Sequence, residues 1–211
     1  MRASLVTLVS VVSLSLSAQG KGSGLRLDRN SLAPTARFVL TMTTSPKAGG
    51  KDVRTFRVEL SGKRARVELS DKSTGDVCYL VNDRGTFLWI PSTKSAQKMD
   101  LAGGIEQALG LAFAQATSAM DGATKSGKAV VSGQPTVVYR NERQGTTIYM
   151  GTGAGFRLPV KVETVNSVGR QTLLASSIKL GGTIPATRFA LPKGTQVLEG
   201  SGAPGSTPGI K

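Results

Sequence analysis

Few side chains in this sequence could carry out covalent chemistry. Cys78 is the only cysteine, and the chain contains no histidine. A thiol needs an activating neighbour to become a nucleophile, and serine hydrolases and the common zinc sites also depend on histidine. Cys78 lies inside the apolar run 77–81, where a small buried hydrophobe is the expected state. We therefore predict a non-enzymatic protein with no catalytic residues, no cofactor and no bound metal.

Two other arrangements come close to known sites. Residues 122–129 nearly form a phosphate-binding loop, but Ala129 stands where a magnesium-binding hydroxyl is needed. The segment also lies between an expected helix and an expected strand, which is the reverse of the required order. Glu59 and Glu68 could face each other across a hairpin, yet each has arginine neighbours on an exposed face. We expect a salt-bridged surface there rather than acid–base catalysis.

Alternation of apolar and polar residues predicts strands through most of the chain after residue 34. Turn-forming residues at 61–63 and 82–85 predict two hairpins. The expected strands, about ten in number, are 37–42, 56–60, 64–69, 76–82, 86–90, 128–132, 136–141, 146–150, 158–165 and 171–180.

One segment breaks this alternation. Its apolar residues recur every three or four positions, at Ile105, Leu109, Ala112, Phe113, Ala116 and Met120. That spacing predicts an amphipathic helix at about 104–120, although its glycines make it depend on packing. A sheet with one apolar face needs a cover, and this helix is the only large candidate. The fold class is therefore mainly β (α+β), a strongly curved antiparallel sheet wrapped on a helix.

The ends of the chain are predicted to lie outside this domain. Residues 1–18 have the pattern of a signal peptide: a positive start, an apolar stretch and small residues near a cleavage site. We expect 19–33 to be loosely ordered, 34–198 to form one domain, and the Gly-, Ser- and Pro-rich tail 199–211 to be disordered. The mature protein should be exported, monomeric and without a transmembrane segment.

The charge balance favours anionic partners. The chain has 27 basic against 13 acidic residues, a formal net charge of +14. For an exported protein these partners are phospholipid head groups, glycolipids or acidic cell-wall polymers. The charge is dispersed and aromatic residues make up only 5% of the chain, so we predict no nucleic-acid binding.

The end of the domain resembles the LolA/LolB-like lipoprotein-carrier superfamily. The residues that carry this resemblance are Leu158-Pro159-Val160-Lys161-Val162-Glu163, then Gly169, Ile178-Lys179-Leu180 and Ile184-Pro185, and finally Phe189-Ala190-Leu191-Pro192-Lys193-Gly194. Two upstream segments, 62–69 and 83–91, are similar to a strand and a hairpin of the same superfamily. The resemblance extends over roughly residues 35–198.

The resemblance implies an unclosed half-barrel in the periplasm, with an apolar cleft between sheet and helix. Such a cleft could hold a lipid acyl chain or a lipidated protein. On this chain it would be lined by Phe38, Leu40, Met42, Phe56, Val58, Val67, Leu69, Phe87, Trp89, Ile105, Leu109 and Phe113.

The resemblance also implies an arginine that contacts the helix cover, which would be Arg64 or Arg66. Strand alternation instead points both away from Val67 and Leu69, toward a solvated convex face. The alternative function is a structural protein with a filled core, which docks on an anionic envelope polymer through its basic surface.

Overall fold

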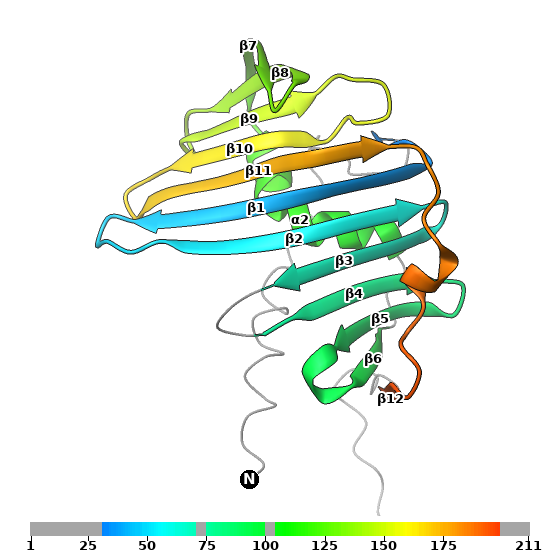
Figure 1. Ribbon diagram of the computed structural model, residues 1–211. Helices are drawn as coiled ribbons and strands as arrows, with labels where there is room; N and C mark the ends of the chain where they lie inside the picture. Colours follow the sequence, from blue (N-terminus) through cyan, green and yellow to red (C-terminus); the bar gives the residue numbers. More distant parts are fainter. Residues whose placement is uncertain (1–30, 71–74, 100–103, 199–211) are drawn as a thin grey trace, which may run out of the picture.

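The chain folds around one large sheet that is curved and not closed (Figure 1). The computed structural model describes residues 31–70, 75–99 and 104–198. The predicted signal peptide, residues 19–30 and the predicted tail lie outside these ranges. Leu32 is buried and forms a bridge with Phe156, so residues just before the domain pack on it.

Twelve strands make up the sheet, in the order β12-β6-β5-β4-β3-β2-β1-β11-β10-β9-β8-β7. Their bounds are β1 Thr35–Pro46, β2 Asp52–Ser61, β3 Arg64–Ser70, β4 Val77–Asn82, β5 Gly85–Ile90, β6 Ser95–Met99, β7 Thr124–Val131, β8 Gln134–Asn141, β9 Thr146–Gly151, β10 Pro159–Val165, β11 Gly169–Leu180 and β12 Gln196–Leu198.

The predicted antiparallel arrangement is confirmed for every pair except one. β12 runs parallel to β6 and extends the sheet by one short strand. β6 and β12 were not among the ten expected strands, because β6 offers only Ala96 and Met99 as apolar residues and β12 is three residues long. The hairpin predicted at 61–63 forms between β2 and β3, where Gly62 has a φ of +56° that favours glycine.

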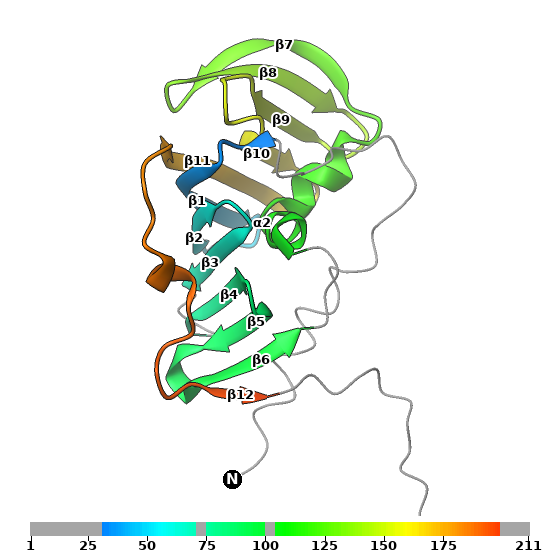
Figure 2. The same ribbon diagram turned by 90° about the vertical axis from the view of Figure 1, so that its right-hand side faces the viewer.

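The predicted helix is confirmed as α2, Gly104–Met120. It lies in the concave side of the sheet, as the view turned by 90° shows (Figure 2). Phe113 has φ −118° and ψ 19°, which are not helical values, so a kink divides α2 into two halves. Two short 3-10 helices, η2 (Pro91–Thr93) and η3 (Ala186–Phe189), lie within the described ranges 75–99 and 104–198, respectively.

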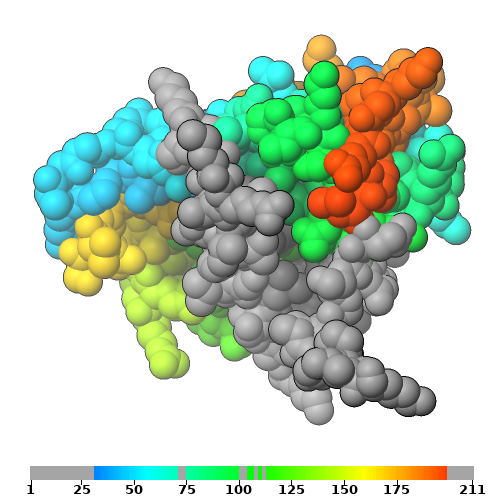
Figure 3. Space-filling view, turned by 90° about the horizontal axis from the view of Figure 1, so that it is seen from below, coloured from blue at the N-terminus to red at the C-terminus, as the bar shows by residue number. Residues whose placement is uncertain are grey.

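The opposite, convex side of the sheet also has a cover. The segment 181–195, which includes η3, runs from β11 along this side to β12 (Figure 2). Seen from below, the end of the C-terminal segment, in orange-red, lies against the green strands of the β5–β6 region (Figure 3). The sheet is therefore packed on both faces, by two different kinds of cover.

Candidate functional site

The concave face of the sheet and α2 enclose one apolar layer. Phe38 lies at its centre, with its ring centroid 6.4 Å from that of Phe113 and 5.3 Å from that of Phe156. The structure brings nine of the twelve predicted cleft residues into this layer: Phe38, Leu40, Val58, Val67, Ile105, Leu109 and Phe113 as buried members, and Met42 and Phe56 as half-buried ones.

This layer is filled in the structure. Leu40, Leu109 and Phe113 are each 0% exposed, so none of them borders a space that admits water. An apolar ligand could enter only if side chains or the helix moved aside.

The other three predicted cleft residues lie elsewhere. Leu69 is half-buried beside Phe56, toward the end of β3. Phe87 and Trp89 pack instead in a second cluster with Cys78, Leu80, Ala96 and Leu191. Because Phe87 pairs with Leu80 and Trp89 with Cys78, both rings point to the convex face. β5 is apolar on both faces, with Phe87 and Trp89 on one and Leu88 and Ile90 on the other. Phe87 and Trp89 are predicted to lie on the concave face, but the structure corrects this prediction and places them on the convex face.

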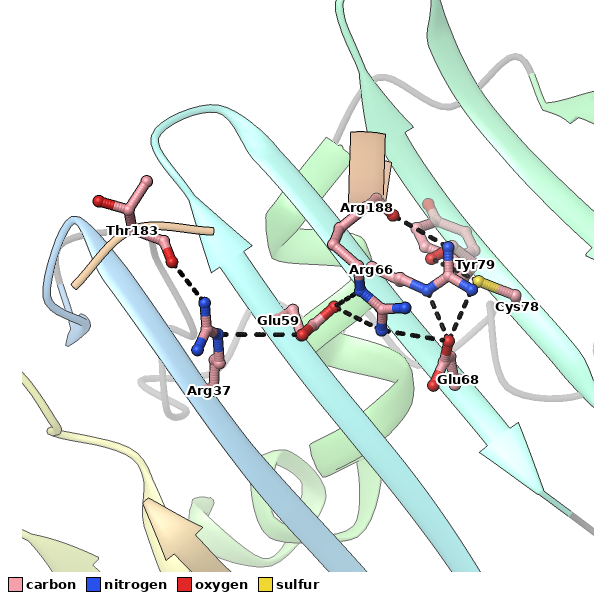
Figure 4. Close-up of polar contacts among 8 residues, drawn as sticks. All are labelled: Arg37, Glu59, Arg66, Glu68, Cys78, Tyr79, Thr183 and Arg188. Atoms are coloured by element: carbon pink, nitrogen blue, oxygen red, sulfur yellow. Dashed lines mark hydrogen bonds and ion pairs between the residues drawn. The ribbon is translucent and has the colours of Figure 1, made fainter. Parts of the chain in front are cut away.

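A network of charged side chains fixes the C-terminal segment to the convex face (Figure 4). Arg66 donates from Nη1 to the backbone oxygen of Arg188 at 2.9 Å and from Nε to Glu68 at 2.6 Å. Arg188 in turn lies 2.9 Å from Glu59, and Arg37 donates to the backbone oxygen of Thr183 at 2.6 Å. These bonds join the sheet to a segment more than a hundred residues away in the chain.

The two arginines that could have contacted the helix both lie on this convex face, as alternation predicts. Arg64 is paired with Asp83, and this exposed pair lowers the pKa of the carboxyl. Arg66 is not solvated but 9% exposed, beneath the C-terminal segment and 5.6 Å from the centre of the Trp89 ring. Neither arginine is joined to α2 by a hydrogen bond or ion pair within the described residues, because β3 turns both away from the concave side.

Two adjacent residues of β4 have titratable groups buried on opposite faces. Burial raises the pKa of the Cys78 thiol to about 12, although Arg66 opposes part of the shift. Burial also raises the pKa of the Tyr79 hydroxyl to about 12. Cys78 is therefore held as a neutral thiol, which agrees with its predicted role as a small buried hydrophobe.

The two halves of α2 are attached to the sheet differently. In the C-terminal half, Asn141 donates to the backbone oxygens of Ala119 at 2.9 Å and Asp121 at 2.8 Å, and Gln115 donates to Gln171 at 2.6 Å. In the N-terminal half, no hydrogen bond joins a described side chain of residues 104–112 to the sheet. Among the side chains of this half that the structure describes, Ile105 and Leu109 make the contacts with the sheet, and these contacts are apolar.

The concave face changes from apolar to polar toward one end of the strands β1, β11, β10 and β9. Four residues paired across neighbouring strands form an apolar row: Met42, Leu173, Val162 and Ile148. Two residues further along each strand, the same face carries a polar row: Thr44, Gln171, Thr164 and Thr146. Sequence analysis missed this row, although the signal was present as a polar residue ending each run of alternating apolar positions.

Two adjacent hollows open at the polar row. One, of about 400 Å³, is lined by Gln115, Ser118, Arg143, Gln144, Thr146, Thr164 and Asn166. A smaller one, of about 90 Å³, is lined by Thr44, Ser45, Pro46, Thr164, Asn166, Val168, Gly169, Arg170 and Gln171. They share Thr164 and Asn166, so they form one polar cleft beside the C-terminal half of α2.

Within the described ranges, no helix is long and apolar enough to cross a membrane. The same residues contain no group of three or more cysteine and carboxylate side chains that could hold a metal ion.

Comparison with known proteins identifies the fold. No family model matches the chain. No curated protein matches it either. A conserved protein from Thermus thermophilus superposes with a TM-score of 0.50 at 13% identity, over 80% of this chain and 92% of that one.

Two further solved structures align less well. MucB in complex with MucA(peri) gives a TM-score of 0.48 at 16% identity, over 82% of this chain and 60% of MucB. A LolA superfamily protein from Nitrosomonas europaea gives 0.39 at 10% identity, over 75% and 90% of the two chains. At these identities the comparisons concern the fold alone. The open curved sheet with α2 on its concave face confirms the unclosed half-barrel that the sequence resemblance implies (Figure 2).

Proposed function

We propose that this chain is a non-enzymatic binding protein of the periplasm. Its ligand is a lipid acyl chain or the lipid of an acylated protein, held between the concave face and α2. The observation that carries the proposal is the attachment of the N-terminal half of α2, whose described side chains cover an extended apolar face through the apolar contacts of Ile105 and Leu109. An acyl chain can replace such contacts, because each buried methylene contributes about 0.8 kcal/mol.

Because the apolar layer is filled, the ligand can enter only if part of α2 moves away from the sheet. The kink at Phe113 and the polar contacts beyond it keep the C-terminal half of α2 in place. The N-terminal half then swings outward as a unit, and the ligand takes the space of Ile105 and Leu109. The nine apolar-layer residues named above line the opened cleft.

The alternative function is a docking protein with a permanently filled core. The complete burial of Leu109 and Phe113 favours it, and so does the net charge of +14. Such a protein would bind anionic envelope polymer in a manner that salt weakens, since exposed charges are screened beyond about 8 Å at physiological ionic strength.

A reversible lock on α2 tests the proposed function. A β-carbon built on Gly104 would lie 3.6 Å from Cγ1 of Val81, so Val81→Cys with Gly104→Cys places two thiols side by side between β4 and the start of α2, and their oxidation to a disulfide is checked by thiol titration. Cys78→Ser removes the natural thiol. We expect the reduced protein to take up a fluorescent fatty acid, and the oxidised protein to bind it at least roughly tenfold more weakly because the open state is no longer populated.

The same molecule serves as its own control, since reduction should restore uptake. Equal uptake in both redox states would show that ligand does not enter beneath this half of α2. Absence of uptake in the wild-type chain, together with salt-sensitive retention on an anionic polymer, would replace the carrier function with the docking one.

A further inference from the structure

We propose that the polar cleft at the edge of the half-barrel binds an anionic, phosphate-bearing head group of the acylated ligand. This inference rests on the proposed function and names the part of the ligand that the apolar layer cannot hold. It assigns the head-group site to the residues around Thr164 and Asn166, with Arg143 as the charged contact and Arg170 at the rim.

The two cross-strand rows give the cleft its relation to the apolar layer. The apolar row and the polar row are adjacent on the same four strands, so the concave face is amphipathic along the strand direction. α2 also changes from apolar to polar along its length. Phe113 is buried in the apolar layer, and two residues later Gln115 donates to Thr164 at 3.2 Å. A ligand lying along the strands under α2 would meet hydrocarbon first and hydrogen-bonding groups at its end.

The hydrogen bonds within the cleft fix its walls. Thr146 and Thr164 are buried and their hydroxyl oxygens lie 3.0 Å apart, while Gln115 bonds to Gln171 at 2.6 Å. The side-chain oxygen of Asn166 accepts from the backbone N–H groups of residues 168 and 169, at 2.9 and 3.2 Å. With its oxygen bonded to its own loop, the NH₂ group is the end of the Asn166 side chain that can donate to a ligand.

The charges of the cleft select the class of ligand. Arg143 and Arg170 are the only charged residues that line either hollow, and no carboxylate lines them. Both arginines are exposed, and neither has an ion-pair partner among the described residues. Glu142 precedes Arg143 in the β8–β9 turn but lines neither hollow. The guanidinium of Arg143, with the amide and hydroxyl donors of the cleft, matches the several acceptor oxygens of a phosphate. Arg170 pairs with Ser45 and Val165, one residue from the polar row, so its side chain leaves the sheet on the other face and borders the smaller hollow only at its rim.

Two lipids with the same chain test the inference. Lysophosphatidic acid and monoacylglycerol, both with a myristoyl chain, differ in the phosphate alone, and calorimetric titration of the full chain gives both affinities. We expect the wild type to prefer the phosphorylated lipid by roughly tenfold or more. Arg143→Gln with Arg170→Gln should remove this preference and leave the affinity for monomyristoyl glycerol unchanged.

The control removes the same charge elsewhere. Arg84→Gln with Arg157→Gln changes two exposed arginines that line neither hollow, so the preference should persist if it depends on the cleft rather than on net charge. Equal affinity of the wild type for both lipids, or equal loss in both double variants, would overturn the head-group site and leave acyl binding standing.

Inorganic phosphate distinguishes the two proposals if neither lipid binds. Binding of phosphate alone that requires Arg143 and Arg170 would retain the anion site and reject acyl binding. No binding of phosphate or of either lipid would reject both.

Discussion

The two covers of the sheet are held by different physical means. On the convex face, the C-terminal segment is tied by directional bonds to backbone oxygens: Arg66 to Arg188, Asn82 to Phe189 at 2.8 Å, and Arg37 to Thr183. On the concave face, the described contacts of the N-terminal half of α2 are those of Ile105 and Leu109, and apolar contact has no preferred direction. A directional network specifies one arrangement, whereas an apolar interface tolerates replacement by another apolar surface. The proposed function uses this difference: it assigns a structural role to the convex cover and exchange with a ligand to the concave one.

The largest expected effect comes from breaking the convex network at its most buried charge. Arg66→Met removes the bonds to Glu68 and to the Arg188 oxygen and leaves Glu68 with a weaker partner, since Arg188 lies 3.6 Å from it. Because Glu68 is only partly buried and keeps Arg188 as a partner, the cost is that of lost charged hydrogen bonds, about 1.5–3 kcal/mol. We expect a decrease of that size in the free energy of unfolding, measured by urea denaturation.

Arg64→Met is the matched control for that variant. Arg64 lies on the same strand and the same face, but its pair with Asp83 is exposed to solvent, so unfolding should be unchanged within error. Equal destabilisation of the two variants would mean that the C-terminal segment does not bury Arg66 in solution.

A smaller effect is expected from alkaline pH, which tests both covers through adjacent residues. Cys78 faces the convex cluster and Tyr79 the concave layer, and the pKa of each is raised to about 12. The unfolded chain loses these protons at lower pH than the folded chain, so the folded state binds more protons above about pH 9 and stability falls as pH rises. Between pH 8 and pH 10 we expect a loss of about 1–2 kcal/mol in the free energy of unfolding.

Single substitutions separate the two contributions. Cys78→Ala should remove most of the decline between pH 8 and pH 10, because the thiol titrates before the phenol in the unfolded chain. Tyr79→Phe should flatten the curve only above about pH 10. An unchanged slope in Cys78→Ala would show that the thiol is not buried beneath the C-terminal segment.

The sequence predicts the concave side of this protein better than the convex side. Residues alternate strictly in β1 and β2: Phe38 and Val58 pair on one face of the sheet, and their neighbours Arg37 and Glu59 pair on the other. Only one face can therefore be apolar. The spacing of Ile105, Leu109 and Phe113 likewise determines the buried stripe of α2. Both patterns are local, so the elements and the apolar layer could be predicted before the structure was known.

The convex side depends on contacts that no local pattern records. In β4 and β5 both faces are apolar, and only the return of Phe189 and Leu191 decides that Phe87 and Trp89 lie outward. Arg66 has the sequence context of a solvated arginine, yet a segment 122 residues away covers it. The polar cleft escaped prediction for the same reason, since its walls come from five elements and the loops between them.

The smallest expected effect sharpens the comparison within α2 itself. Gly110 lies in the N-terminal half, and a β-carbon added there would meet nothing within 4 Å. Gly110→Ala should therefore stabilise the protein by about 0.5–1 kcal/mol through its higher helix propensity. Gly104→Ala is the contrasting variant, because Gly104 has a φ of +45° that costs alanine about 1 kcal/mol. Because the proposed N-terminal half swings out as an intact helix, Gly110→Ala stabilises the closed and open positions alike and should leave the rate of fatty-acid uptake unchanged. Gly104→Ala strains the start of the helix, where it meets Val81, and should hasten uptake, as stopped-flow fluorescence can measure. Slower uptake in Gly110→Ala would mean that this half unwinds rather than swings, and unchanged uptake in Gly104→Ala would place the moving part of the cover elsewhere than in residues 104–112.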